Sequence, residues 1–456
     1  MHTSLRAQRH AVAARAAARA LTIILLAGLI APAPVFASQL DTDIICGTTV
    51  AEGSYDEEDV PDIDAANAIV LGSDGTVYYE RDADEQVKIA SITKVMTAIV
   101  ALENADLDDA ITVDEEAATV GQSSIYLEEG DTLTLETALL GLLKSSGNDC
   151  AMAIASSVGA IIDPESDDPY QTFVDAMNEK AAELGMESTV FTNPHGLDFD
   201  EWEGDLCSSA SDVATMFAYA MENETFRELE ASDTTVVTVE AADGSTRWIE
   251  LAERNEIYGE SGNIGGKTGT TDLAGNCFVG AFSQDAGGEV YVVVLGCTEE
   301  DQRWDDTLAL ADWYYAHVVS VPFANTTEEL ADGTPILVSA SLSSWTDKTV
   351  DVTLEDASQT VMAFGLGGSI EQTISLYELS GTVEAGDEVG YITYTQDGKE
   401  LGSATLVAAE TVEEPGFFEG IMVWFDRLLR NITGRSTVAD TVVYNEVPDP
   451  AAYDAA

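Results

Sequence analysis

The chain has 456 residues, 45% of them hydrophobic, so it is long enough for more than one domain with a sizeable core. Its 83 Asp and Glu residues outnumber 19 Lys and Arg, and the formal net charge is −64. Such a surface repels the phosphates of nucleic acids, which excludes a nucleic-acid-binding protein. The five Cys residues show no Cys-x-x-Cys spacing, which argues against a zinc site, and we expect no metal and no cofactor.

Residues 1–37 have the pattern of a secretory signal peptide. Four arginines and no acidic residue precede an apolar stretch from Leu21 to Ile30, and Val35-Phe36-Ala37 fits a cleavage site. A membrane-spanning anchor is the alternative, but the apolar run is shorter than the ~20 residues that a span needs. Cleavage would leave 15 cationic and 83 acidic residues, a net charge of −68. We therefore expect a secreted protein at the extracytoplasmic face of the cell membrane or in the cell wall.

Residues 38–61 are acidic and weakly patterned, and we interpret them as a linker. Residues 62–321 alternate strand-like and helix-like segments and predict one α/β domain. A hairpin is expected around Asp74-Gly75, and strands after Gly266 are expected to complete the sheet from the other end of the chain. Helices are predicted over 91–105, 135–146, 150–162, 173–186 and 307–319. The last two cysteines, Cys277 and Cys297, flank a predicted hairpin and are candidates for a disulfide.

Residues 323–414 alternate apolar and polar side chains with Gly and Asp turns between, which predicts a small all-β domain. Residues 415–435 predict an amphipathic helix whose apolar positions, from Phe417 to Ile432, are accompanied by Arg427, Arg430 and Arg435. This helix either lies on a membrane surface or packs on the β domain. Residues 436–456 are expected to be disordered.

Three of the seven lysines of this acidic chain, Lys94, Lys144 and Lys267, lie in or beside serine and Lys-Thr-Gly motifs. Ser91 and Lys94 form a Ser-x-x-Lys at the start of a predicted helix, and residues i and i+3 share a helix face about 5–6 Å apart. Free backbone N–H groups at such a start can stabilise an oxyanion. Lys94 can take the serine proton if burial and a second cation, such as Lys267, keep it neutral. The pattern predicts nucleophilic catalysis by Ser91.

The triplet Ser-Gly-Asn occurs at Ser146–Asn148 and again at Ser261–Asn263, just before Lys267-Thr268-Gly269. A Ser-x-x-Lys, a Ser-x-Asn and a Lys-Thr-Gly in this order are the signature of penicillin-binding proteins and class A β-lactamases. With the flanking blocks "LETALLGLLKSSGNDCAMAIA" and "GGKTGTTDLAGNCFVGA", the chain resembles the serine D-alanyl-D-alanine carboxypeptidases, the low-molecular-mass penicillin-binding proteins. The resemblance covers about Asp62 to the amphipathic helix.

The resemblance implies an antiparallel sheet flanked by helices, as in penicillin-binding proteins and β-lactamases, followed by a β domain and the amphipathic helix. It also implies removal of the terminal D-Ala from peptidoglycan pentapeptide stems, a part in cell-wall synthesis and cell shape, and covalent inhibition by penicillins. Ser91 would be the nucleophile, Lys94 its general base, and Ser146 the proton relay to the leaving group. Asn148, Lys267, Thr268 and Thr270 would bind substrate, and the amides of Ser91 and Thr270 would form the oxyanion hole.

Other interpretations stay open. A β-lactamase would turn penicillin over, but the middle motif reads SGN rather than SDN, and no E-x-x-L-N stretch follows it. A catalytically silent wall-binding protein is a third reading, against which the intact serines and lysines argue. We expect Ser146 rather than Ser261 to be the working copy, because Ser261–Asn263 enters the same strand as Lys267. Lys144 is expected to be a helix-end charge and His195, in "NPHG", a turn residue.

Overall fold

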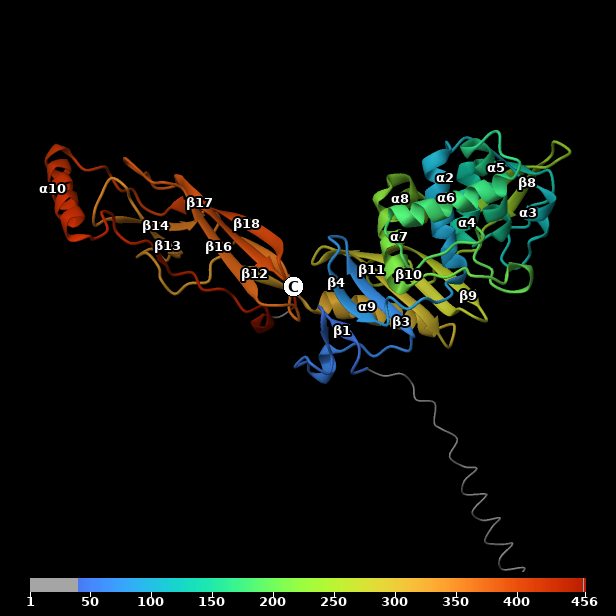
Figure 1. Cartoon of the computed structure of the whole chain (residues 1–456), viewed down its shortest axis with the longest axis horizontal. Helices are drawn as coiled ribbons and strands as arrows, with labels where there is room; N and C mark the ends of the chain where they lie inside the picture. Colours follow the sequence, from blue (N-terminus) through green and yellow to red (C-terminus); the bar gives the residue numbers. More distant parts are fainter. Residues whose placement is uncertain (1–39, 454) are drawn as a thin grey trace, which may run out of the picture.

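The computed structural model describes residues 40–453 and 455–456. The predicted signal peptide lies outside the described residues. The described chain forms an N-terminal α/β part and a C-terminal β part that lie end to end along the long axis of the molecule (Figure 1). The predicted α/β fold with a small all-β domain is confirmed.

A seven-stranded antiparallel sheet forms the centre of the N-terminal part, in the order β2-β1-β4-β3-β11-β10-β9. Its strands are β1 Ile44–Ile45, β2 Thr48–Thr49, β3 Asn67–Gly72, β4 Val77–Arg81, β9 Asn263–Thr271, β10 Gly275–Gln284 and β11 Gly288–Cys297. The predicted hairpin is β3–β4, and strands from the two ends of this part meet where β3 pairs with β11. The sheet thus joins segments far apart in sequence, as expected.

Both faces of this sheet are covered by other elements. Because successive side chains of a strand point to opposite faces, each strand contributes apolar side chains to both. On β11, Tyr291, Val293 and Leu295 belong to the core beneath the helical layer, whereas Val290, Val292 and Val294 pack towards α9. The helical layer contains α2 Lys94–Asn104, α3 Glu115–Thr119, α4 Leu135–Lys144, α5 Asn148–Ile162, α6 Pro169–Glu183, α7 Ala210–Glu222 and α8 Glu224–Glu230, and α9 Gln302–Ala316 covers the other face (Figure 1).

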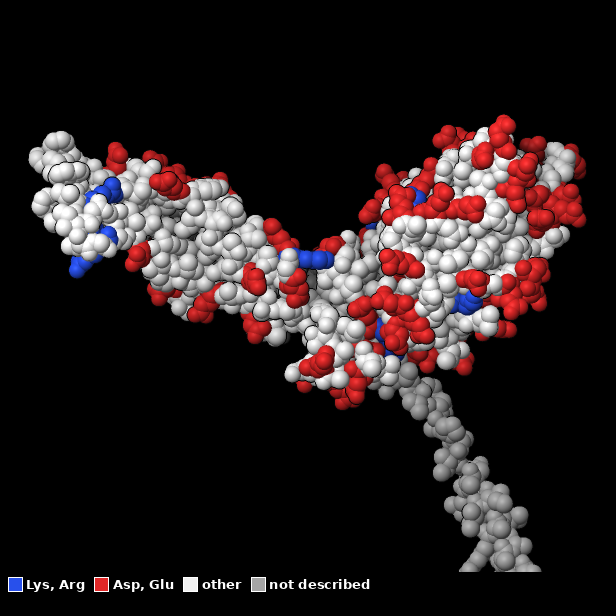
Figure 2. All heavy atoms as spheres, viewed as in Figure 1, with Lys and Arg blue, Asp and Glu red and all other residues white. Residues whose placement is uncertain are grey.

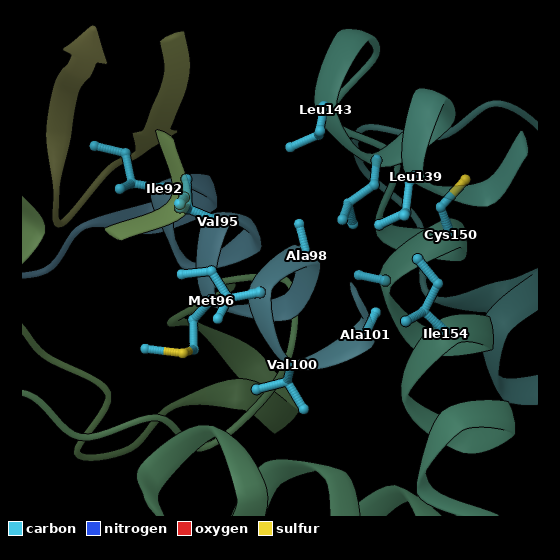
Figure 3. Packing of buried hydrophobic residues seen from close by; sticks show 14 of the residues in the cluster. Ile92, Val95, Met96, Ala98, Val100, Ala101, Leu139, Leu143, Cys150 and Ile154 are labelled. Atoms are coloured by element: carbon cyan, nitrogen blue, oxygen red, sulfur yellow. The ribbon is translucent and has the colours of Figure 1, made fainter. Parts of the chain in front are cut away.

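A smaller sheet lies at the outer end of the helical layer. It has the order β5-β6-β7-β8, with β5 Ala110–Thr112, β6 Thr132–Thr134, β7 Val236–Glu240 and β8 Thr246–Glu250. The core between the helices contains apolar side chains from α2, α4 and α5, among them Met96, Ala98, Leu139 and Ile154 (Figure 3). This packing fixes α2 relative to the loop between α4 and α5.

The C-terminal part is a six-stranded antiparallel sheet in the order β16-β17-β18-β14-β13-β19, with a separate pair β12-β15. Its elements are β12 Val318–Pro322, β13 Val338–Ser341, β14 Thr349–Leu354, β15 Thr360–Phe364, β16 Ile370–Leu376, β17 Glu388–Gln396, β18 Lys399–Ala408, α10 Phe417–Thr433 and β19 Val442–Val443. Lys399 Nζ contacts Thr76 Oγ1 at 2.7 Å and so connects the β17–β18 turn to the β3–β4 turn.

Three expectations along the chain were wrong. Residues 38–61 are not only a linker, because β1 and β2 extend the sheet and Asp43 accepts two hydrogen bonds from the buried guanidinium of Arg81. The helix expected to reach 319 ends at Ala316, since the β-branched run that follows forms β12 and pairs with β15. Part of the tail expected to be disordered is ordered, because β19 pairs with β13 and the buried Asn445 donates to Phe323 O.

All five cysteines are free, so the disulfide considered for Cys277 and Cys297 is absent. Across the β10–β11 pair the residue opposite Cys297 is Asn276, not Cys277. Cys150, Cys277 and Cys297 are buried. Packing and hydrogen bonds rather than cross-links therefore hold this fold together.

Candidate active site

Ser91 lies in a 3₁₀ turn, Ala90–Thr93, that leads directly into α2. The turn is held in an uncommon conformation, since Ala90 before the serine has a φ of 47°. Lys94 is the first residue of α2, and its Nζ lies 2.8 Å from Ser91 Oγ. The i, i+3 spacing therefore brings the serine and the lysine into contact, as the sequence predicts.

The amine of Lys94 is fully enclosed. The residue is 0% exposed, and its Nζ also contacts Asn148 Oδ1 at 2.7 Å and the backbone oxygen of His195 at 2.8 Å. Burial, and next the charge of Lys267, lower the pKa of Lys94 well below its ordinary value. A neutral Lys94 has a lone pair directed at the serine hydroxyl, which is what a general base needs.

Ser146 faces the same space from the loop between α4 and α5. Its φ of 56° places it in the left-handed region, and Lys267 Nζ on β9 donates to Ser146 Oγ at 2.9 Å. Lys267 also donates to Thr268 O at 2.8 Å and is 1% exposed. Burial lowers the pKa of Lys267 to about 7, Glu230 opposes this shift, and Arg254 and Arg303 add to it.

Asn148 begins α5 and connects these groups to the neighbouring loop. Its Nδ2 donates to Gly121 O at 2.9 Å, while its Oδ1 receives Lys94. Because both ends of the amide are hydrogen-bonded, the side chain has one fixed orientation. Two serine–lysine pairs, Ser91–Lys94 and Ser146–Lys267, therefore face each other, with the amide of Asn148 bonded to Lys94.

Strand β9 forms one wall of the site. It is the last strand of its sheet, and no strand of the described chain pairs with its outer edge. The turn that carries Ser91 packs against it so closely that a Cβ on Gly269 would lie 2.5 Å from Ile89 O. The edge with Thr268 and Thr270 is therefore open beside the nucleophile, where an extended peptide can add as a further strand.

Arg303 at the start of α9 joins the site and was not expected from the sequence. Its Nη1 donates to Thr270 Oγ1 at 2.9 Å, it is 5% exposed, and its guanidinium lies over the ring of Trp304. Its buried Nε has no hydrogen-bond partner among the described residues. The scarcity of cations that drew attention to the lysines could have identified this arginine too.

The remaining expectations can now be placed. Ser261 and Gly262 precede β9, and the buried Asn263 side chain donates a hydrogen bond to Ala281 O. The second SGN copy therefore stabilises the backbone of the sheet and lies outside the group of serines and lysines. Lys144 ends α4 as expected and pairs with Glu253. His195 stands in a turn capped by Asn193, as expected, but its carbonyl oxygen also receives Lys94, a backbone role that no side-chain pattern indicates.

The family model for D-alanyl-D-alanine carboxypeptidases, peptidase family S11, matches residues 54–299, which contain all of these groups except Arg303. The chain belongs to this family. A second model, the C-terminal domain of penicillin-binding protein 5, matches residues 325–414 in the β part of this S11 family member. The resemblance that the motifs indicated is confirmed.

Three relatives show how far the similarity extends. The chain is 28% identical over 388 residues to D-alanyl-D-alanine carboxypeptidase DacC of Escherichia coli, a match that covers 79% of this chain and 87% of that protein. DacF of Bacillus subtilis is 24% identical over 78% of this chain and 87% of the relative. DacB2 of Mycobacterium tuberculosis is 32% identical over 56% of this chain and 84% of the relative.

Solved structures agree with this placement. The Streptomyces K15 DD-transpeptidase is 28% identical, with a TM-score of 0.51, and the match covers 56% of this chain and 97% of that one. DacD of Francisella tularensis, at 24% identity and a TM-score of 0.51, shares the fold over 77% of this chain and 94% of its own. The S11 family member described here is thus a serine hydrolase of the low-molecular-mass penicillin-binding protein class.

Proposed function

We propose that this protein removes the terminal D-Ala from peptidoglycan stem peptides that end in D-Ala-D-Ala, through an acyl-enzyme on Ser91. The observation that carries the proposal is the pair of buried lysines facing two serines, with Lys94 Nζ 2.8 Å from Ser91 Oγ and Lys267 Nζ 2.9 Å from Ser146 Oγ. One pair has a neutral amine beside a nucleophile, and the other has a serine able to pass a proton.

In the first half of the reaction, Ser91 Oγ attacks the carbonyl carbon of the penultimate D-Ala while Lys94 takes the hydroxyl proton. The negative oxygen that develops is stabilised by the backbone N–H groups of Ser91 and Thr270. The C–N bond then breaks, and the proton taken by Lys94 passes through Ser146 to the leaving D-Ala nitrogen. The stem peptide stays bound as an ester of Ser91.

In the second half, Lys94 takes a proton from the water that attacks the ester carbon. The C–O bond to Ser91 breaks, Lys94 returns the proton to Ser91 Oγ, and the shortened peptide leaves. The substrate lies as a strand along the edge of β9, with Asn148 bonded to its amide. Lys267 and Thr268 hold the terminal carboxylate. Arg303 adds a second cation beside this edge, where its Nη1 donates to Thr270 Oγ1. Penicillins, as acylating agents with a carboxylate, would bind the same groups and trap Ser91.

A fluorescent penicillin tests this proposal together with a D-Ala-D-Ala peptide. We expect one label per chain on a peptide that contains Ser91, found by mass spectrometry, and release of free D-Ala from the peptide. Ser91→Ala should lose both signals and keep its thermal unfolding transition. Rapid hydrolysis of the penicillin without a stable label would instead favour a β-lactamase, and a folded protein with no D-Ala release would overturn the proposal.

We also propose that α10 attaches the protein to a membrane surface. The helix exposes a continuous set of large apolar side chains: Phe417, Phe418, Ile421, Met422, Trp424, Phe425, Leu428, Leu429 and Ile432. Its contact with the β part includes the buried Val423 and a hydrogen bond from Arg427 to Ser343 O. No helix in the described part of the chain has the length and hydropathy to cross a bilayer. The exposed apolar face supports an interfacial helix, which would bury these side chains in the headgroup region at an extracytoplasmic membrane face.

The domain boundaries that accompany this proposal follow the same parts. We assign catalysis to residues 62–321, with β1 and β2 as an N-terminal extension of the sheet, and a spacer role to residues 323–414. The helix 415–435 would provide the attachment. Figure 1 shows α10 at the end of the molecule far from the catalytic part, so attachment there leaves the site free for substrate.

A further inference from the structure

The side chain of Glu230 contacts the open edge of β9 at Gly266, the residue that precedes the Lys-Thr-Gly motif. Glu230 is the last residue of α8, and its Oε2 accepts a hydrogen bond from the backbone N–H of Gly266 at 2.9 Å. Its other oxygen, Oε1, is buried and has no partner among the described residues. The Glu230 side chain packs closely against β9, since a Cβ added to Gly265 would lie 3.0 Å from Glu230 Cβ.

This contact identifies which backbone groups of β9 face outwards. In an antiparallel pair the N–H and C=O of one residue point to the same side, and the side alternates along the strand. Because the Gly266 N–H points to Glu230 and away from β10, the backbone groups of Gly266, Thr268 and Thr270 share the open edge. Glu230 thus occupies one of the positions that an added peptide strand would otherwise use.

The direction of the substrate follows from the proposed function, on which this inference rests. Ser91 and the Thr270 amide meet the scissile carbonyl, so the penultimate D-Ala lies near the Gly269–Thr270 end of the edge. The terminal carboxylate lies towards Lys267. The peptide therefore runs antiparallel to β9, and its carboxyl end points at Gly266 and Glu230.

We propose that Glu230 closes the carboxyl end of the substrate groove and restricts the enzyme to peptides with a free terminal residue after the scissile bond. Gly266 lies about 7 Å along the strand from Thr268, at ~3.3 Å per residue, which leaves room for one residue before the Glu230 side chain. A peptide that continues beyond the terminal D-Ala would meet that side chain and find the Gly266 amide already bonded. Glu230 is thus a determinant of carboxypeptidase over endopeptidase activity.

The electrostatics at this end are compatible with a bound carboxylate. Burial raises the pKa of Glu230 to about 7, a shift that the Gly266 amide, Lys267 and Lys144 oppose and Glu253 increases. A carboxyl group that takes up a proton near neutrality can stand beside a substrate carboxylate without repelling it. The group closes the groove by its volume and its hydrogen bond rather than by a fixed negative charge.

The test compares two peptides that share the scissile bond: an acylated D-Ala-D-Ala and the same peptide extended to D-Ala-D-Ala-Gly. We expect the wild type to cleave the extended peptide with a far lower kcat/KM. Glu230→Ala should raise the extended-to-free ratio of kcat/KM about tenfold, as expected when a wall of a pocket is removed. Glu230→Gln keeps the volume and an acceptor oxygen for Gly266, and should keep the wild-type ratio.

Two further variants complete the design. Glu228→Ala removes an exposed acidic residue from the same helix and should change neither rate. Labelling by fluorescent penicillin confirms that Ser91 works in each variant. If Glu230→Ala is not labelled, Glu230→Asp, which is one methylene shorter, decides in its place and should raise the ratio by a smaller factor.

Two outcomes would overturn the inference. One is a wild type that cleaves both peptides equally well, and the other is a labelled Glu230→Ala with the wild-type ratio. Failure of the proposed function would look different, because the wild type would then release no D-Ala from the free peptide, before any variant is compared.

Discussion

The cationic side chains of the catalytic part and those of α10 have opposite surroundings. Lys94, Lys267 and Arg303 are buried and bonded to site residues, and Arg81 is buried against Asp43. On α10, by contrast, Arg435 is exposed and Arg427 and Arg430 are half-buried beside exposed apolar side chains. Figure 2 shows acidic side chains crowded over the catalytic part, whereas the α10 end is mainly uncharged with a few cations.

From this difference we infer two separate tasks for cations in so acidic a chain, according to where they lie. A buried lysine has lost its hydration, so its pKa falls and it becomes available for proton transfer or for binding a carboxylate. An arginine at the edge of an exposed apolar helix face keeps its charge and favours a surface with anionic headgroups. The predictions below test these two tasks separately, from the largest expected effect to the smallest.

The largest effect is expected for the buried base. Lys94→Ala removes the proton acceptor of Ser91 and should lower the acylation rate by penicillin about 10³-fold, within the range for general-base loss. Stopped-flow measurement with a fluorescent penicillin checks this. Lys348→Ala, which removes an exposed cation stacked on Trp345 in the β part, is the matched control and should leave acylation unchanged. Equal rates for the two variants would contradict the assignment of Lys94.

The second effect concerns the exposed face of α10. Replacing Phe418, Trp424 and Phe425 with Ser should weaken binding to phosphatidylglycerol-containing vesicles about 10²-fold, because three large apolar groups no longer enter the interface. Co-sedimentation measures this, and kcat/KM on a soluble peptide should not change. Tyr391→Ser, an exposed aromatic of the β part, serves as the control. Vesicle binding that survives the triple change would contradict the membrane role.

The third effect is a pH dependence of substrate binding. The pKa of Lys267 is about 7, so below pH 7 the ammonium is charged and binds the terminal carboxylate, and above pH 7 the charge is lost. Each pH unit above the pKa lowers the charged fraction about tenfold, so kcat/KM should fall by that factor on the alkaline side. A D-Ala-D-Ala amide, which lacks the carboxylate, should not show this fall. An identical alkaline limb for both peptides would assign it to another group.

The smallest effect is a response of stability to salt. The acidic groups over the catalytic part repel one another in the folded state, and added salt screens this repulsion. Thermal unfolding should shift upwards by about 3 °C between low and physiological ionic strength. Sodium and potassium chloride should give the same shift, because screening depends on ionic strength and not on a bound ion. A shift with only one of them would point to a specific cation site instead.

Much of the site could be predicted because its parts are local patterns. Ser91 and Lys94 are three residues apart on one helical turn, so the contact follows from helix geometry. The choice of Ser146 over Ser261 also followed from the order of elements, since Ser261 enters the strand that carries Lys267. The hairpin around Asp74-Gly75 and the strands after Gly266 were readable from their alternation.

The remainder depends on contacts between distant segments. Arg303 and Glu230 reach β9 from α9 and α8, and nothing beside them in sequence distinguishes Glu230 from the other acidic residues. The His195 carbonyl is a backbone atom and carries no residue-type signal. The ordering of β1 depends on the ion pair of Asp43 and Arg81, and that of the tail depends on Asn445. The periodicity of apolar residues along the sequence does not predict such long-range contacts.

The five free thiols have a practical consequence for how the protein can be handled. Burial raises the pKa of Cys46 to about 12 and that of Cys277 to about 11, and it also raises those of Cys150 and Cys297. At neutral pH these four side chains are thiols rather than thiolates, which makes them slow to alkylate or oxidise. Because no disulfide has to form, the folded enzyme is compatible with a reducing environment, and a mild reductant can be kept throughout its purification.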